Sequence, residues 1–166
     1  MSHFTNSLLL AAALGMSAST LAENCTGDAA KLSAMDTVVM ALNTQDLSLL
    51  DGIARSDFNR VAPDVSTESL DAWKTMYAAI FDAFPDYRIT NELMAADCDG
   101  GFIRWNVTAT NSGNSAQSAT GNRINVTGVS NFLFDRDGKI THEMVFWDPS
   151  QMAQQLESEA IPYVAR

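Results

Sequence analysis

In the stretch FLFDRDGKITHEMVFW (residues 132–147) a short turn signal separates two runs rich in aromatic and β-branched residues, and the first run continues an alternation of apolar and polar residues that begins near Asn122. Alternation with a period of two is typical of β-strands. The residues between the runs, Asp135-Arg136-Asp137-Gly138, are types that favour tight turns. The stretch therefore predicts a β-hairpin, in which a strand over Asn122–Phe134 returns as a strand over Lys139–Trp147.

A second pattern of strand, turn and strand precedes this hairpin. Tyr87–Ala96 and Phe102–Thr110 have the residue pattern of strands on either side of the turn-forming segment Asp97–Gly101, and Asn111–Gly121 is a polar loop. Four strands joined in this way form an antiparallel meander.

The first half of the chain has apolar residues at helical spacing instead. This spacing predicts a helix over Asp28–Asn43, a short helix over Leu47–Ile53, an irregular or extended piece over Asn59–Val65, a long helix capped by Ser66 and ended by Pro85 after Phe84, and a last helix opened by Asp148-Pro149. Helices followed by a meander indicate an α+β fold. We expect a curved antiparallel sheet wrapped around the long helix.

A sheet that curls around a helix encloses space, and the aromatic residues of this chain could line it. They are Trp73, Tyr77, Phe81, Trp105, Phe132, Phe146 and Trp147. The set predicts an apolar ligand pocket, with an ordinary aromatic core as the alternative.

Charge and composition exclude several classes of partner. The 166 residues carry a formal net charge of −10. Nucleic acid and anionic membranes bind clustered Lys and Arg, so neither is an expected partner. Without its leader, the chain retains one histidine, His142, which excludes a site built from several histidines. No metal and no cofactor are predicted.

The N-terminal segment has the features of a secretory signal peptide. An apolar run over residues 8–16 is followed by small residues up to Ala22, and the run is shorter than the roughly 20 residues of a membrane span. We predict cleavage after Ala22, a single domain over residues 23–166, and a periplasmic or secreted protein. The alternative is an N-terminal core helix.

Two cysteines remain after such cleavage, Cys25 and Cys98. In an oxidising compartment an even pair predicts a disulfide. Two free or buried thiols are the alternative.

From Phe84 onward the chain resembles the SnoaL-like polyketide cyclase and ester cyclase family, within the nuclear transport factor 2-like superfamily. The matching pieces are Phe84-Pro85-Asp86-Tyr87-Arg88, Arg104-Trp105, Thr110-Asn111-Ser112-Gly113, Thr120-Gly121-Asn122-Arg123, Asp137-Gly138-Lys139-Ile140, Trp147-Asp148 and Gln154-Gln155-Leu156. The resemblance implies a cone-shaped domain with an apolar cavity, and dimers packed through the sheet.

The resemblance also implies where the acid and base residues of the family's cyclases would fall. Their catalytic Asp aligns with Val145, and the histidines that assist align with Asn131 and Asn111. None of these three side chains titrates, so the family's usual proton transfer is not expected at these positions.

Two carboxylates could replace the missing base. Glu143 lies two residues before Val145, so strand alternation places both on one face. Asp148 could lie at the cavity rim. The alternatives are a solvated Glu143 and an Asp148 that only caps the last helix. His142 would point to the opposite face, and Arg104 would pair with Glu92.

These observations leave two hypotheses. The first is an exported enzyme that acts on a small apolar carbonyl compound with Glu143 or Asp148 as acid/base. The second is a non-catalytic binding or assembly module. The predicted ligand-binding residues are Trp73, Tyr77, Trp105, Asn111, Asn131, Val145 and Trp147.

Overall fold

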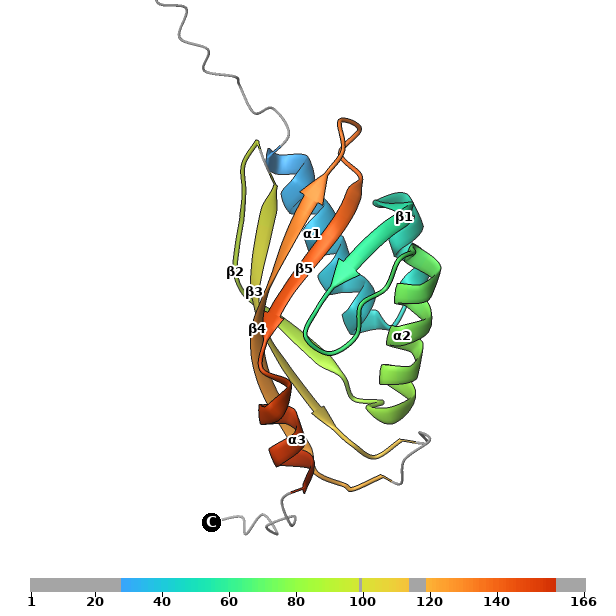
Figure 1. Cartoon of the computed structure of the whole chain (residues 1–166), viewed down its shortest axis with the longest axis vertical. Coiled ribbons are helices and arrows are strands. Elements are labelled where there is room, and N and C mark those ends of the chain that lie inside the picture. Colours follow the sequence, from blue (N-terminus) through green and yellow to red (C-terminus); the bar gives the residue numbers. More distant parts are fainter. Residues whose placement is uncertain (1–27, 99, 114–118, 158–166) are drawn as a thin grey trace, which may run out of the picture.

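A computed structural model describes residues 28–98, 100–113 and 119–157 (Figure 1). In chain order the elements are helix α1 (Asp28–Thr44), 3-10 helix η1 (Leu47–Gly52), strand β1 (Ala54–Val61), helix α2 (Leu70–Ala83), strands β2 (Arg88–Ala96), β3 (Gly101–Thr110), β4 (Arg123–Phe134) and β5 (Ile140–Trp147), and helix α3 (Pro149–Glu157). The predicted signal segment and Cys25 lie outside the described residues, so export and the disulfide with Cys98 stay predictions.

The predicted meander is confirmed, and a fifth strand joins it. The strand order is β1-β5-β4-β3-β2, with antiparallel pairing from β2 to β5. Strand β1 pairs with β5 in parallel. The sequence predicted only an irregular or extended piece over Asn59–Val65, whereas this strand runs over Ala54–Val61. Arg60 interrupts the apolar alternation of β1, yet it is buried two residues after the buried Phe58.

The long helix begins later than predicted. Ser69, and not Ser66, caps α2, and its hydroxyl accepts a hydrogen bond from the Ala72 N–H at 3.1 Å. The chain is still extended at Thr67, which exchanges two backbone hydrogen bonds with Arg60 of 2.8 and 2.9 Å. A helix therefore cannot start at Ser66. Phe84 ends the helix as expected.

The turn between β4 and β5 agrees with its sequence. The Asp135 carboxylate accepts hydrogen bonds from the N–H groups of Asp137 (3.0 Å) and Lys139 (2.9 Å). Gly138 has φ +76°, a conformation that other residues rarely adopt.

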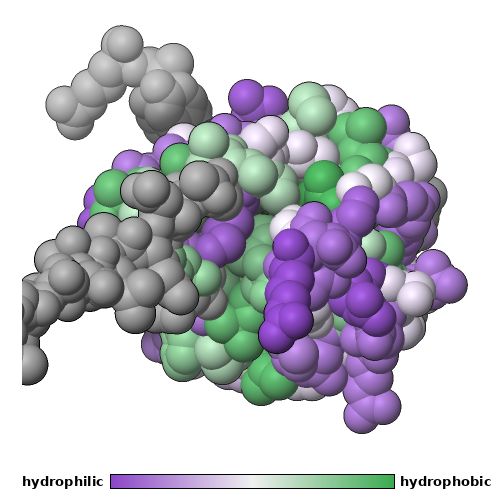
Figure 2. Space-filling model, turned by 90° about the horizontal axis from the view of Figure 1, so that it is seen from above, coloured by the Kyte–Doolittle hydropathy of each residue, from purple (hydrophilic) through white to green (hydrophobic). Residues whose placement is uncertain are grey.

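The helices cover the concave face of the curved sheet. Helix α1 packs against β2 and β3, α2 packs against β1, and α3 packs against β4 (Figure 1). The main core lies between these helices and the sheet. Seen from the end that carries the β4–β5 turn, apolar residues reach the surface between hydrophilic ones (Figure 2). No helix in the described ranges is long and apolar enough to cross a membrane.

Candidate functional site

A cavity of about 470 Å³ lies between the concave face of the sheet and helices α1 and α2. Most of its wall is apolar. Its apolar lining includes Val38 and Leu42 of α1, Met76 and Ile80 of α2, and Ile103, Val107, Ile124, Val126 and Val145 of the sheet. A concave apolar space with few polar groups is the usual form of a small-molecule site.

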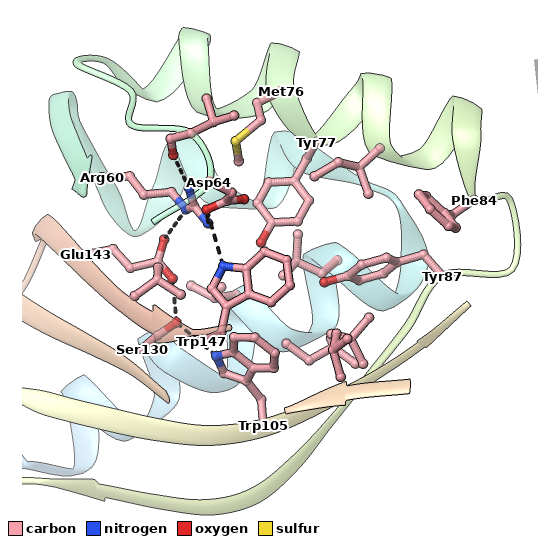
Figure 3. Close-up of a pocket in the computed structure, with 18 of the residues that line it drawn as sticks. Arg60, Asp64, Met76, Tyr77, Phe84, Tyr87, Trp105, Ser130, Glu143 and Trp147 are labelled. Atoms are coloured by element: carbon pink, nitrogen blue, oxygen red, sulfur yellow. Dashed lines mark hydrogen bonds and ion pairs between the residues drawn. The ribbon is translucent and has the colours of Figure 1, made fainter. Parts of the chain in front are cut away.

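Glu143 stands at one end of this cavity and is only 4% exposed. Its Oε1 accepts a hydrogen bond from the Ser130 hydroxyl at 2.7 Å (Figure 3). Its Oε2 accepts one from Trp73 Nε1 at 3.2 Å. Burial raises the pKa of Glu143, and this effect exceeds the opposing effects of Arg60, Ser130 and Trp73. The alternative of a solvated Glu143 is therefore wrong.

Arg60 of β1 provides the positive charge beside this carboxylate. Its Nε lies 3.6 Å from Glu143 Oε2, which is an ion-pair distance but too long for a hydrogen bond. The other guanidinium nitrogens reach the Asp64 carboxylate at 3.3 Å and the Val65 carbonyl. Trp147 Nε1 donates to the same Asp64 oxygen at 3.3 Å. This network joins the segment after β1 to the end of β5.

Ser130 links the carboxylate to the aromatic wall. Its hydroxyl accepts a hydrogen bond from Trp105 Nε1 at 3.1 Å while donating to Glu143. Gly128 makes room for the indole, since a Cβ at that position would lie 2.4 Å from a Trp105 ring carbon. Trp105 is thus held against β4 with its N–H directed at Ser130.

The structure places five of the predicted site residues at the cavity wall. They are Tyr77, Trp105, Glu143, Val145 and Trp147. Trp73 lies behind the wall instead. It is 2% exposed, and its indole packs between Phe58 and Tyr77 and holds the Glu143 carboxylate.

The expectation that Asn131 faces the cavity is wrong. A regular hairpin running from the Phe134–Ile140 pair would set Asn131 opposite Glu143. The register shifts next to that pair, where Leu133 pairs with His142 and Thr141 is the extra residue. This extra residue turns the following side chains of β5 over, so Glu143 and Val145 are buried on the same face as Ile140. Asn131 lies between the buried Ser130 and Phe132 on β4, so strand alternation points it outward, where it donates to the Gly101 carbonyl at 3.3 Å.

Asn111 does not line the cavity either. It is buried, and its side chain accepts a hydrogen bond from the Thr120 N–H at 2.7 Å and donates to the Ala83 carbonyl at 3.4 Å. These bonds tie the two ends of the polar loop to the end of α2. An amide with this structural role is not available to a ligand.

Asp148 is exposed and lies outside the set of residues that line the cavity. Its carboxylate accepts a hydrogen bond from the Ser150 N–H at 2.9 Å, and bonds to Ser150 hold its pKa below the ordinary value. The alternative of a cap for the last helix fits this geometry. Arg104 pairs with Glu92 at 3.1 Å and His142 is exposed, both as expected.

Sequence reasoning missed Arg60, Asp64, Ser130 and Tyr87, all of which line the cavity. For Ser130 a signal existed, because it lies two residues from Phe132 on the same face of a strand. Arg60 could not be found in this way, since its position depends on a pairing between β1 and the distant β5.

A family model described as SnoaL-like polyketide cyclase matches residues 32–156. No curated protein is significantly similar in sequence. Among solved structures, AclR of Streptomyces galilaeus, described as a candidate hydroxylase, has a TM-score of 0.67 and 24% identity over 77% of this chain and 96% of its own. IdmH of Streptomyces antibioticus, a candidate polyketide cyclase, has a TM-score of 0.65 and 20% identity over 76% and 97%.

An LEH-like epoxide hydrolase of M. tuberculosis is also similar, with a TM-score of 0.62 and 15% identity over 78% of this chain and 90% of that one. At such identities these structures show a shared fold, and they confirm the predicted nuclear transport factor 2-like architecture. The family model and the neighbours together support a cyclase-like or ligand-binding role.

Proposed function

We propose that this chain, which belongs to the SnoaL-like polyketide cyclase family, binds a small apolar carbonyl compound in its cavity and moves a proton to or from it through Glu143. The observation that carries the proposal is a buried carboxylate with a raised pKa at the wall of an apolar cavity. A carboxyl group in such a place titrates closer to neutral pH, where it can act both as acid and as base.

Glu143 would act on a carbon next to a carbonyl group. Its carboxylate takes a proton from that carbon, and the electron pair of the broken C–H bond forms the enolate. Returning a proton to carbon restores the carbonyl compound. Attack of the enolate on a second carbonyl instead closes a ring and turns that carbonyl oxygen into an alkoxide, which takes the proton from the Glu143 carboxyl group. The second path is the aldol-type step that the family implies.

Ser130 is placed to carry the proton between Glu143 and a ligand. With Glu143 ionised, the Ser130 hydrogen points to Oε1 while its oxygen accepts from Trp105. With Glu143 protonated, the carboxyl hydrogen can point to Ser130 Oγ instead. The Ser130 hydrogen is then free to turn towards the cavity, because a hydroxyl has one hydrogen and two acceptor positions.

The test uses a defined probe, 2-acetylnaphthalene, in D2O. Proton abstraction exchanges the methyl hydrogens of this ketone for deuterium, which NMR follows without knowledge of the natural substrate. We expect the native protein to speed the exchange and Glu143→Gln to lower the rate about 10²- to 10⁴-fold. Asp148→Asn is the matched control, since it neutralises an exposed carboxylate outside the cavity wall, and it should leave the rate unchanged.

If Glu143→Gln keeps the full exchange rate, Glu143 is not the base. If the native protein binds the ketone without any exchange, the second function is favoured, namely a binding module without chemistry. Two observations support that alternative. Both oxygens of Glu143 already have protein partners. Val145, which lines the cavity, occupies the position where the family resemblance puts the usual base.

We also propose, from the sequence, that the protein is exported after cleavage at Ala22, that Cys25 bonds to Cys98, and that two chains pair through the sheet. Mass spectrometry of the secreted or periplasmic protein, with and without reduction, tests the first two. A measured mass that corresponds to a chain starting at Met1 would contradict the cleavage. Equal alkylation of the cysteines with and without reduction would contradict the disulfide.

A further inference from the structure

Two tyrosines meet in the cavity away from the Glu143 cluster. Tyr77 comes from the middle of α2 and is 9% exposed, and Tyr87 lies just before β2 and is partly buried. Both line the cavity, and their hydroxyl oxygens point into its interior (Figure 3). They come from two different elements, so their convergence is a product of the fold.

The two rings are held by aromatic packing. Tyr77 lies 4.5 Å from the Trp73 ring and 5.9 Å from the Phe81 ring, measured between ring centres. Tyr87 meets Phe81 at 5.6 Å and Tyr77 at 6.2 Å, both edge to face. Such contacts fix the direction of each hydroxyl before any ligand arrives.

The two hydroxyls have no acceptor among the residues that the structure describes. Within the described part of the chain, neither one forms a hydrogen bond to the backbone or to another side chain. Both face the cavity instead. The hydrogen of each hydroxyl is therefore available to an acceptor in the cavity.

Both phenols remain donors over a wide pH range. Burial raises the pKa of Tyr77 and of Tyr87 well above the ordinary value of 10.0. Neither becomes an anion that would repel a ligand oxygen.

We propose that Tyr77 and Tyr87 form a second binding point of the cavity, a phenol pair that donates a hydrogen bond to the carbonyl oxygen of an uncharged, apolar ligand. The inference rests on the proposed function only in taking the cavity as the ligand site, and it does not require proton transfer by Glu143. It sets the ligand class. The phenol pair provides hydrogen bonds but no positive charge, so a neutral ketone or ester oxygen suits it better than a carboxylate.

The test compares two probes of nearly equal shape, 2-acetylnaphthalene and 2-isopropenylnaphthalene, of which only the first has a carbonyl oxygen. Calorimetry gives Kd for both with the native protein, Tyr77→Phe, Tyr87→Phe and the double variant. A Phe ring keeps the aromatic packing and removes only the hydroxyl. We expect the double variant to weaken ketone binding about 2- to 10-fold and to leave hydrocarbon binding unchanged.

A spectroscopic measurement separates this bond from general polarity. With ¹³C in the carbonyl group, the stretching frequency of the bound ketone should be lower than in hexane, and it should rise in the double variant. The phenol pair would be overturned if the double variant left the carbonyl stretching frequency unchanged, or if it weakened the binding of both probes equally. Neither result would bear on proton transfer by Glu143. Absence of deuterium exchange with a shifted frequency would overturn only proton transfer by Glu143. A native protein that binds neither probe would overturn both.

Discussion

Each face of strand β5 carries side chains that depart from the usual distribution of polar and apolar residues. On the concave face the charged Glu143 is 4% exposed, in contact with Ser130, Trp73 and Arg60. On the convex face the apolar Phe146 is 63% exposed and Met144 is 38% exposed. Both arrangements cost free energy in an isolated chain.

The difference shows that the two faces meet different needs. A buried carboxylate is retained only where its partners compensate the loss of water, and here α2, β4 and β1 supply them. An exposed apolar side chain needs no partner within the chain, but it favours contact with another molecule. The concave face is therefore suited to a ligand and the convex face to a second protein surface.

The largest expected effect comes from removing the charge that balances Glu143. In Arg60→Met the buried carboxylate has no counter-charge, so the free energy of unfolding at neutral pH should fall by about 3–5 kcal/mol. The double variant Arg60→Met, Glu143→Gln removes both charges and should recover part of this loss. Urea unfolding of the native protein, Arg60→Met and the double variant measures these free energies.

Arg55→Met is the matched control on the same strand. Arg55 pairs with Asp57 at 2.8 Å, but both side chains are exposed, so water compensates for the lost pair. A loss for Arg55→Met as large as that for Arg60→Met would mean that burial does not distinguish the two pairs. A double variant that is no more stable than Arg60→Met would lead to the same conclusion.

A second prediction concerns pH, and it has opposite signs for the two candidate carboxylates. Glu143 has a pKa above its ordinary 4.5 when folded, so the unfolded chain ionises first and stability falls as pH rises through that interval. Asp148 has a pKa below its ordinary 3.8 when folded, so its contribution is present at higher pH and is lost as pH falls through the folded pKa.

Unfolding curves of the native protein, Glu143→Gln and Asp148→Asn at a series of pH values measure these contributions. The native protein should lose stability relative to Glu143→Gln as pH rises above about 4.5. Relative to Asp148→Asn it should lose stability as pH falls below about 3.8. If the stability of the native protein relative to each variant changed in the same direction with pH, the environments of Glu143 and Asp148 would not be as different as their burial indicates.

The sequence predicted the local parts of this fold well. The turn at residues 135–138 determined which segments pair, and alternation placed Glu143 and Val145 on one face, where the structure has them. The helical spacing of apolar residues predicted that Tyr77 points towards the sheet, and it lines the cavity there. Each of these features depends on residues close together in the chain.

The failures depend on contacts between distant residues. The parallel pairing of β1 with β5, which brings Arg60 to Glu143, leaves no periodic signal in either segment. The extra residue at Thr141 looks like any other strand residue in the sequence, yet it sets Glu143 opposite the buried Phe132 and not opposite Asn131. A single bulge on β5 thus brought the carboxylate to the face of β4 that carries Ser130.

The smallest effect on the folding of one chain is expected on the convex face. Phe146→Lys replaces a side chain that is 63% exposed, so the free energy of unfolding of the monomer should change by no more than about 0.5 kcal/mol. If two chains pair through this face, the amine introduced by the substitution would lose its water in each chain without gaining a counter-charge, and pairing should fail. Sedimentation should then give two chains for the native protein and one for the variant. A native protein that sediments as one chain contradicts the proposed dimer, and a variant that still sediments as two places the contact on another surface.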